Sequence, residues 1–565
     1  MQLSLMTFMY ELPLLMSGPW NEEKNAAMEL ILEIAAGEGF PGVDLTYSTV
    51  CAMGVERVQA LLRKYRLRLT SLICFDHLAD PALEEAEALA PYLDSIRVSK
   101  LLSCDHLMLV PGHVDPAVDP GLIRETIIRR SRVLVDQAAA ENIQCMIEND
   151  PDLGIGMCAE ADVRAVLEGV PGLKLVCDTA NMIVAGEDPV AFYEALHEYT
   201  IHVHVKDLNV CDDPDMYRNE GADGVFYTSV PHDTGLVDFE SVFRSFGKHH
   251  HQGILSLEFV PTRQGSPEAL REDLHRIYRR FTALACRYSL GVNEVPLLSK
   301  LIPEPEEQVW PQLIGRGISG VEICILPEET PQLRAYEEEV SKRFQNPRSF
   351  ARGEEILRFV RSIRSAGLEV HSAHLMFCEV YPELIAENVP YLLQVSRQTG
   401  IRQFVVSCSF ETAQRTRAFI PFLQQAANAL KEEGGTLCYH NHHQDSSVLE
   451  NGRTAFEMIL EECPDIMLQL DVGWAWYGGM DPVAFMKAHG DRIASVHLKD
   501  LTEDARERSD PGRFTAIGQG CVPIRDVLDH LPLCRLSCGK LIIDQDASAG
   551  DMYDDLASGA SFVQK

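Results

Sequence analysis

Short apolar runs rich in β-branched residues alternate with amphipathic stretches along the whole chain. Asn21–Ala36 is one such stretch, in which Met28, Ile31, Leu32 and Ala35 recur at helical spacing. This alternation predicts parallel strands joined by crossover helices. In the first half the predicted strands are Leu3–Phe8, Val43–Thr46, Leu69–Cys74, His106–Val110, Gln144–Glu148, Lys174–Asp178, Ile201–Val205 and Ile254–Phe259.

The second half repeats the scheme. An amphipathic helix is predicted at Pro267–Cys286, and the first strand of this half is expected at Ser289–Asn293. The other predicted strands are Val321–Ile325, Glu369–Ala373, Gln403–Ser407, Thr436–His440, Met467–Asp471, Ile493–Leu498 and Leu541–Asp544. We therefore predict an α/β chain of two tandem (β/α)8 TIM barrels, residues 1–287 and 288–565, although strand counting alone also allows a doubly wound sheet.

Two motifs recur between the halves. DTANMIVAGEDP begins at Asp178 and DVGWAWYGGMDP at Asp471, while HVKD begins at His204 and HLKD at His497. Both pairs are offset by the same 293 residues. An equal offset for two separate motifs indicates an internal duplication.

Composition excludes several classes of protein. The formal charge of −34 disfavours nucleic-acid binding, which uses clustered Lys and Arg. No apolar stretch approaches the ~20 residues that span a bilayer, and no Lys or Arg precedes the apolar N-terminal run, as a secretory signal requires. The 16 cysteines lie in apolar runs without a C-x-x-C pair, which is typical of reduced thiols. We expect a cytoplasmic protein with a small-molecule partner, and the sequence does not predict its oligomeric state.

Polar residues close four successive strands of the first half. They are Glu148, Asp178, His204 and Glu258. The carboxyl ends of barrel strands converge on one mouth, where three carboxylates and an imidazole would repel one another without a cation. Mn²⁺ suits this mixed oxygen and nitrogen set best, and Mg²⁺, Co²⁺ or Zn²⁺ are alternatives. Taken singly, a Glu or Asp that closes a strand is more commonly a helix cap or an ion-pair partner than a functional residue.

The second half places His440, Asp471, His497 and Asp544 at the equivalent strand ends. This set also predicts a metal site. It differs in that His440 replaces Glu148, and Asp544 replaces Glu258 with a shorter arm.

These residues and motifs resemble the xylose isomerase-like TIM barrel family, once per half. In the second half YHNH, DVGWAWYGGMDP, VHLKD, the GQG of Gly518–Gly520 and IIDQD together resemble bacterial sugar phosphate isomerase/epimerase proteins, and YHNH also resembles inosose dehydratases. The resemblance implies a metal-dependent enzyme acting on a carbohydrate. By analogy with the family's epimerases, Glu148 and Glu258 would be both ligands and proton carriers that form and quench an enediolate.

The family's endonucleases use additional histidines that this chain lacks. Position 181 is Asn and position 474 is Trp, where the family's epimerases and endonucleases usually carry His. His113, His232 and Asp233 do not complete a three-metal pattern, and His249–His251 is expected to be a polar surface run.

Several neighbouring residues are candidates for substrate binding. Lys206 and Lys499 follow the two site histidines, and with Asp207 and Asp500 they would orient substrate oxygens, support the histidines or form rim ion pairs. Trp474 would stack on a sugar or pack elsewhere. His442, with His443, would line the second site, acting as a free base, or only cap it.

We predict a sugar or keto-sugar isomerase or epimerase. The alternatives are an inosose-type dehydratase, or a barrel pair in which one or both sites serve binding or scaffolding without catalysis.

Overall fold

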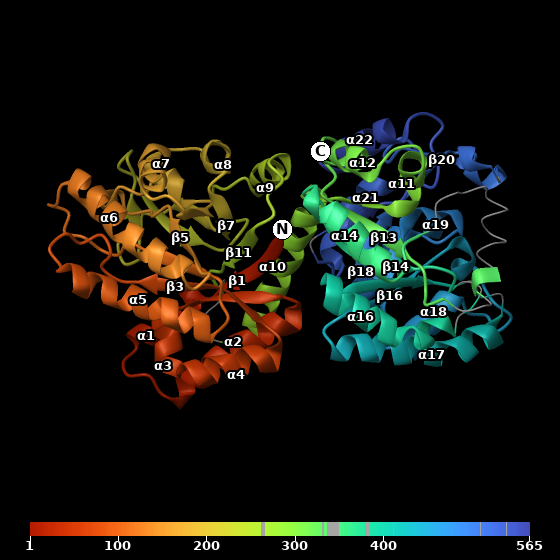
Figure 1. Cartoon of the computed structure of the whole chain (residues 1–565), viewed down its shortest axis with the longest axis horizontal. Coiled ribbons are helices and arrows are strands. Elements are labelled where there is room, and N and C mark those ends of the chain that lie inside the picture. Colours follow the sequence, from red (N-terminus) through yellow and green to blue (C-terminus); the bar gives the residue numbers. More distant parts are fainter. Residues whose placement is uncertain are drawn as a thin grey trace. The chain divides into compact units, whose positions relative to one another are not determined.

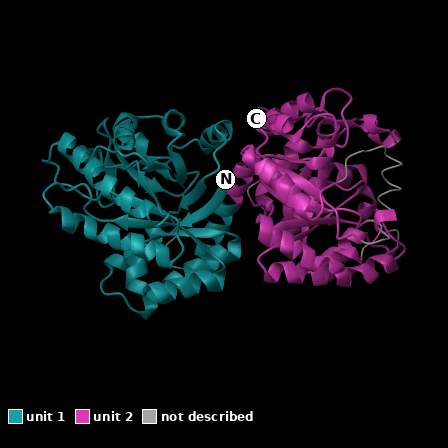
Figure 2. Ribbon diagram, in the orientation of Figure 1, with its two compact units in different colours: residues 1–278 teal, residues 279–565 magenta. Residues whose placement is uncertain are grey.

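The computed structural model describes residues 1–261, 266–329, 333–335, 350–378, 381, 383–408, 410, 412–508, 510–537 and 539–565. They form two compact units, Met1–Tyr278 and Arg279–Lys565 (Figure 2). The division falls within helix α10 (Pro267–Tyr288), and the predicted boundary between residues 287 and 288 lies at the end of the same helix.

The first unit is a closed barrel of parallel strands. The barrel is closed by the pairing of β1 with β11, from Gln2↔Ile254 to Met6↔Glu258. Met6, Ile73 and Met146 belong to the buried apolar cluster of this unit. In chain order its strands are β1 (Gln2–Met6), β2 (Gly42–Thr46), β3 (Arg68–Phe75), β4 (His106–Val110), β5 (Gln144–Glu148), β6 (Lys174–Asp178), β7 (Thr200–Val205) and β11 (Ile254–Glu258).

Helices of this unit surround its strands (Figure 1). They are α1 (Phe8–Met16), α2 (Glu22–Glu38), α3 (Tyr47–Met53), α4 (Val55–Tyr65), α5 (Glu85–Leu101), α6 (Pro120–Ala139), α7 (Glu160–Gly169), α8 (Pro189–Leu196), α9 (Phe239–Lys248) and α10. A small antiparallel sheet follows β7, with strands β8 (Asp207–Val210), β9 (Asn219–Glu220) and β10 (Phe226–Val230).

The second unit is also a closed parallel barrel, in which β12 pairs with β21 at Gly291↔Ile542 and Val292↔Ile543. The prediction of two tandem TIM barrels is therefore confirmed. The barrel strands are β12 (Gly291–Asn293), β13 (Gly320–Ile325), β14 (Glu369–Leu375), β15 (Gln403–Ser407), β16 (Thr436–His440), β17 (Met467–Asp471), β18 (Ile493–Leu498) and β21 (Leu541–Ile543).

A two-stranded sheet, β19 (Asp500–Leu501) with β20 (Phe514–Thr515), follows β18, as the three-stranded sheet follows β7 in the first unit. The described helices of this unit are α11 (Glu294–Leu301), α12 (Glu306–Ile314), α14 (Glu354–Ser365), α15 (Leu384–Glu387), α16 (Val389–Thr399), α17 (Ala413–Glu432), α18 (Ala455–Glu462), α19 (Val472–Tyr477), α20 (Pro482–His489), α21 (Ile524–His530) and α22 (Met552–Val563).

The repeated Asp-Pro pair of the two halves begins a helix in each barrel. Asp188 caps α8 by accepting a hydrogen bond from the backbone of Ala191, and Asp481 caps α20 in the same way. Proline occupies the first helical turn in both, where its missing N–H leaves no bond unmade. The duplication thus includes local folding signals as well as site residues.

Two of the differences between the sequence expectations and the structure concern the start of β12 and the burial of His251. β12 begins at Gly291, because Ser289 still donates its backbone N–H to Ala285 at the end of α10. His251 is 6% exposed and packs against the rings of Tyr193 and Phe246, so the expected surface run is wrong at this position. A ring with two polar atoms on an apolar frame can be buried in this way.

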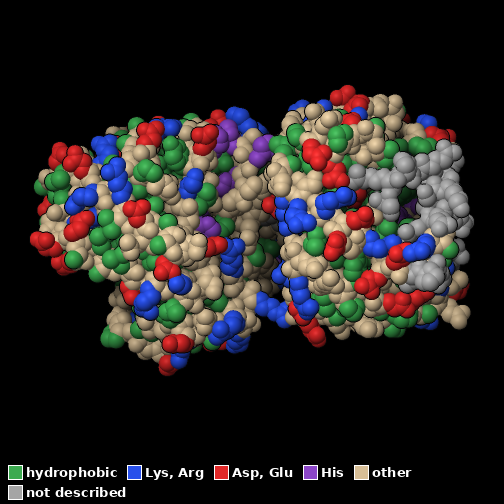
Figure 3. Space-filling view, viewed as in Figure 1, with side chains coloured by type: hydrophobic (Ala, Val, Ile, Leu, Met, Phe, Trp, Pro, Cys, Tyr) green, Lys and Arg blue, Asp and Glu red, His purple; other side chains and the backbone are tan. Residues whose placement is uncertain are grey.

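Acidic and basic side chains are interspersed over the visible face of each unit (Figure 3). The cysteines that the structure describes are nearly all buried. Among the described residues, the helices are too short or too polar to span a bilayer.

Candidate metal centres

The four candidate ligands of the first barrel meet at one point. Glu148, Asp178 and Glu258 close β5, β6 and β11, and His204 lies at the end of β7. Each offers a ligand atom that lies within 4.8 Å of those of the others. Asp178, His204 and Glu258 are buried, and Glu148 is half-buried.

Local hydrogen bonds hold Asp178 in place. Its Oδ1 accepts from the backbone N–H groups of Ala180 and Asn181, both at 2.8 Å. Asn149 accepts from the backbone N–H of Asp178 at 2.8 Å and donates to its carbonyl at 3.3 Å. Oδ2 is buried and accepts no hydrogen bond from a described residue. Burial raises the pKa of Asp178 well above its usual range, although Lys206 opposes this.

Lys206 faces the carboxylates of this cluster. Its Nζ lies 3.0 Å from Glu258 Oε1 and 3.9 Å from Asp178 Oδ2. Burial would lower the pKa of Lys206, but Glu258 and Asp178 raise it above its ordinary value. The ammonium thus balances part of the negative charge of the cluster.

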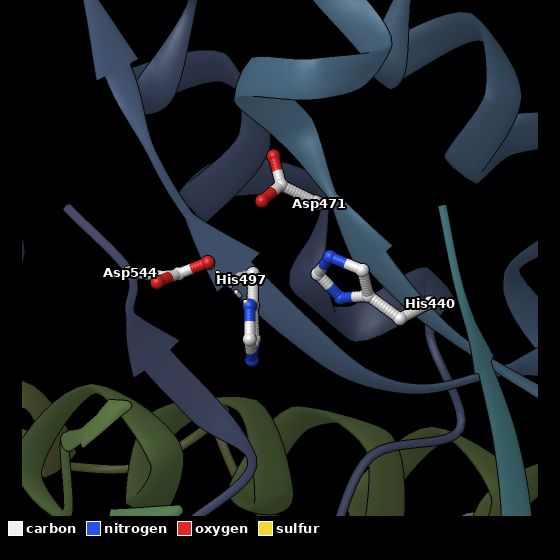
Figure 4. A group of neighbouring side chains, drawn as sticks. All are labelled: His440, Asp471, His497 and Asp544. Atoms are coloured by element: carbon white, nitrogen blue, oxygen red, sulfur yellow. Dashed lines mark hydrogen bonds and ion pairs between the residues drawn. The ribbon is translucent and has the colours of Figure 1, made fainter. Parts of the chain in front are cut away.

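The candidate ligands of the second barrel also converge (Figure 4). His440, Asp471 and His497 come from the ends of β16, β17 and β18, and Asp544 directly follows β21. All four are buried, with ligand atoms within 4.8 Å of one another. His497 Nδ1 lies 3.1 Å from Asp544 Oδ2, as the dashed line in the figure marks.

Hydrogen bonds hold Asp471 in the same way as they hold Asp178 in the first barrel. Its Oδ1 accepts from the backbone N–H of Trp474 at 2.7 Å. Asn441 accepts from its backbone N–H at 2.9 Å and donates to its carbonyl at 3.1 Å. Its Oδ2 is again buried without a described hydrogen-bond partner. Burial raises the pKa of Asp471 to about 7.

Lys499 repeats the position of Lys206 with one more acidic neighbour. Its Nζ lies 3.0 Å from Asp544, 2.9 Å from Asp546 and 3.6 Å from Asp471. It also lies 4.9 Å from the centre of the Trp474 ring, within the range of a cation–π contact.

A cavity of about 140 Å³ opens beside the second cluster. His440, His497 and Asp544 line it, together with His442 and Trp474, two residues outside the ligand set. Burial first, and Lys499 second, lower the pKa of His442 to about 3, so its imidazole is uncharged at neutral pH. The candidate substrate residues His442 and Trp474 therefore share one cavity with candidate ligands.

Sequence reasoning missed a carboxylate on the second strand of each barrel. Asp44 Oδ2 lies 2.9 Å from His202 Nε2 and 3.7 Å from His204 Nε2. Glu322 Oε1 lies 2.8 Å from His497 Nε2. The available signal was an acidic residue within an apolar strand, since buried charges in proteins are normally paired.

Asp207 and Asp500 serve a structural role that the sequence did not indicate. Asp207 accepts from the backbone N–H groups of Gly235 and Val237. Asp500 likewise accepts from the backbone N–H groups of Gly518, Gly520 and Val522. Each aspartate fixes the loop that returns from the small sheet to the barrel, and neither reaches the site histidine or forms a described rim ion pair.

The remaining polar candidates do not belong to either cluster of ligands. His113 is exposed, with Nδ1 3.5 Å from Asp152, and Asp233 is also exposed. His232 Nε2 lies 2.7 Å from the carbonyl of Val205. Among the described residues, none of the three belongs to a group of side chains placed to hold a metal.

Comparison with known proteins gives short, partial relatives. An inosose dehydratase from Geobacillus kaustophilus (strain HTA426) is 36% identical over 112 residues, which are 18% of this chain and 36% of that protein. An inosose dehydratase from Clostridium beijerinckii (strain ATCC 51743 / NCIMB 8052) is 28% identical over 122 residues, 19% of this chain and 41% of that protein. The chain thus spans less than half the length of these curated relatives.

A solved structure of IOLI protein with a bound zinc atom is 12% identical and covers 51% of this chain and 99% of that chain, with a TM-score of 0.41. A family model described as xylose isomerase-like TIM barrel matches residues 32–280 and again residues 317–532. These two matches cover well over half of the sequence, one in each barrel. The chain therefore belongs to the xylose isomerase-like TIM barrel family and contains two copies of the family's barrel.

Proposed function

We propose that the chain is a metal-dependent enzyme that moves protons on a sugar, a keto-sugar or a cyclitol, and that its first barrel is an isomerase or epimerase. The observation that carries the proposal is the convergence of four ligand side chains, two of them glutamates, at the carboxyl ends of neighbouring strands. TIM-barrel enzymes have their active sites at this end. The inosose dehydratase relatives support a small polyhydroxylated substrate.

Both ligand sets fit a divalent ion. Each contains one buried aspartate oxygen, of Asp178 or of Asp471, without a described hydrogen-bond donor, and each holds more carboxylates than its lysine can neutralise. Three carboxylates with one imidazole favour Mn²⁺ in the first barrel, with Mg²⁺, Co²⁺ or Zn²⁺ as alternatives. When bound, such an ion supplies a Lewis acid for a substrate carbonyl oxygen.

Glu148 and Glu258 are the proposed proton carriers. Glu258 is held by Lys206 at 3.0 Å, and Glu148 by His204 Nδ1 at 2.5 Å, so the two carboxylates have separate partners. One carboxylate removes the proton from the carbon next to the carbonyl, and the other returns it. Return to the opposite face of the same carbon gives an epimer, and return to the neighbouring carbon gives an isomer.

The second barrel favours a different reaction, the loss of water from an inosose-like substrate. His440 takes the place of Glu148, and an imidazole whose lone pair is bound to a metal is a poor base. His442, by contrast, lines the cavity without belonging to the ligand set. It is the proposed base for a dehydratase-type step in this barrel.

Solvent exchange tests the proposal for the first barrel. Chelator-treated protein reloaded with Mn²⁺ is incubated in D₂O with a panel of ketoses, and deuterium at the carbon next to the carbonyl is measured by mass spectrometry. We expect exchange by the native chain and its loss in the double variant Glu148→Gln, Glu258→Gln, which keeps both side-chain lengths but removes both bases. Glu56→Gln, an exposed glutamate on α4, is the matched control and should leave exchange unchanged.

Metal content gives the second readout of the same variants. Elemental analysis should find up to two equivalents per native chain and fewer in the double variant. Native turnover and native metal content in the double variant would refute the assignment of this site.

A further inference from the structure

A single buried carboxylate in the second barrel connects to both candidate histidine ligands. Glu322 Oε1 lies 2.8 Å from His497 Nε2. Glu322 Oε2 accepts a hydrogen bond from Gln469 Nε2 at 2.6 Å, and Gln469 Oε1 lies 2.9 Å from His440 Nδ1. Glu322 and Gln469 are both fully buried, so they have no contact with solvent.

The carboxylate of Glu322 determines which atom donates in each hydrogen bond between His497, Glu322, Gln469 and His440. Gln469 Nε2 and Ser372 Oγ both donate to Glu322 Oε2, so this carboxylate oxygen acts as an acceptor toward both partners. The amide nitrogen of Gln469 must therefore face Glu322, and its oxygen must face His440. The proton of His440 then lies on Nδ1, which leaves the lone pair on Nε2. His497 donates from Nε2, and its Nδ1 faces Asp544.

The first barrel has neither a histidine at the position of His440 nor a glutamine at the position of Gln469. In the sheet register Glu148 pairs with Val176, whereas His440 pairs with Gln469. A glutamate ligand has no tautomer to fix, and there the glutamine is replaced by an apolar side chain.

The second-strand acids are also equivalent, because both directly follow a register shift in their strands. The shorter Asp44 is 3.7 Å from His204, whereas Glu322 is 2.8 Å from His497. The longer acid and the glutamine therefore occur in the barrel that has two imidazole ligands.

We propose that Glu322 and Gln469 are positioning residues that fix the tautomers and ring orientations of His497 and His440, so that both imidazoles present a lone pair to one metal ion. The inference rests on the proposed metal site of the second barrel. Partners of this kind raise the basicity of ligating histidines and orient them.

Two variants remove matched hydrogen bonds from the same oxygen. Gln469 Nε2 and Ser372 Oγ both donate to Glu322 Oε2 at 2.6 Å, but only the glutamine also contacts a candidate ligand. The experiment uses the full chain with Glu148→Gln and Glu258→Gln, so that only the second barrel retains its ligand set. Calorimetric titration with Mn²⁺ should show a loss of affinity of about 10- to 100-fold for Gln469→Val and little change for Ser372→Ala.

Nitrogen-15 shifts of labelled histidines test the tautomer without any metal. The resonances of His440, identified by their loss in His440→Gln, should report the Nδ1–H form in the metal-free chain and a shift toward Nε2–H in Gln469→Val. An Nε2–H form in the unsubstituted site, or equal affinity losses in Gln469→Val and Ser372→Ala, would overturn the inference while leaving the metal site intact. Failure of the chain to bind Mn²⁺ at all would instead refute the metal site of the proposed function, and the inference with it.

Discussion

At the scale of single residues, each site places one lysine against an excess of negative charge. Lys499 is 1% exposed and faces Asp471, Asp544 and Asp546, and Lys206 faces Asp178 and Glu258. Removing one partner from a buried ionic cluster leaves the other charges uncompensated, which is far more destabilising than losing an exposed pair.

We therefore predict that Lys499→Met destabilises the metal-free chain by about 3–5 kcal/mol. Because a bound cation would replace the missing charge, Mn²⁺ should raise the unfolding temperature of the variant more than that of the native chain. Lys431→Met removes an exposed ion pair to Asp465 of 2.8 Å and should have a small effect. Similar losses in the two variants, measured by calorimetry, would contradict the prediction.

The positions of the candidate ligands were readable from the sequence, because a polar residue closing an apolar strand marks the barrel mouth. Their supporting partners were not. Glu322 and His497 lie 175 residues apart, and only the closed sheet brings them together. Gln469 has no local signal, since one polar residue in a strand is compatible with many roles.

At the scale of elements, the loop after the small sheet of each barrel depends on close approach of the backbone to an aspartate. A Cβ at Gly520 would lie 2.3 Å from Asp500 Oδ1, and one at Gly235 would lie 2.2 Å from Asp207 Oδ1. Glycine is thus required by the space available at these two positions.

Gly520→Ala should cost about 1–3 kcal/mol of unfolding free energy, because the added methyl group must displace the aspartate or the loop. Gly550→Ala is the matched control, since a Cβ there has no neighbour within 4 Å. Urea unfolding of the two variants compares them directly. Equal stability in both would show that the loop moves freely away from Asp500.

Strand positions could be predicted from the sequence, because the runs are apolar, short and separated by clear helical patterns. β5, β6, β15, β16, β17 and β18 have the predicted bounds. β12 is shorter than predicted because Ser289 still donates its backbone N–H to Ala285 of α10, and an apolar run that follows a helix looks the same as the start of a strand. The small sheets after β7 and β18 were not predicted, since their strands are short and polar.

At the scale of the whole molecule, the two barrels share a frame but differ in the groups that must lose a proton to bind a metal. Burial would lower the pKa of His497, but Glu322 and Asp544 raise it to about 10. The metal-free site therefore holds a proton that a metal must displace at neutral pH.

Metal affinity of the second barrel should accordingly rise with pH, by about tenfold per unit between the pKa of Asp471, about 7, and that of His497, about 10. Affinity increases with pH because the proton on His497 competes with the cation. This competition ends once the pH exceeds the raised pKa of His497. Calorimetry at about pH 8.5, where Asp471 is ionised and His497 is protonated, in buffers with different ionisation enthalpies should detect about one proton released per metal bound. Binding heats that are independent of the buffer would exclude this account.

The two aspartates at equivalent positions allow the activities of the barrels to be separated. We expect Asp178→Asn to abolish proton exchange, because it removes a ligand from the two-glutamate site, and Asp471→Asn to leave that exchange in place. Both variants are assayed with one substrate. Loss of exchange in Asp471→Asn alone would show instead that the second barrel carries out the proton exchange.

Closure of the first barrel also sets an order of events during synthesis on the ribosome. β1 pairs with β11, so Gln2–Met6 has no partner on that side until Ile254–Glu258 has been made. At about 5–20 residues per second this interval is roughly 10–50 s, during which an open sheet edge is exposed to other nascent chains. Glu258 is supplied by that last strand, so the candidate ligand set of the first barrel is completed in the same step that seals the edge.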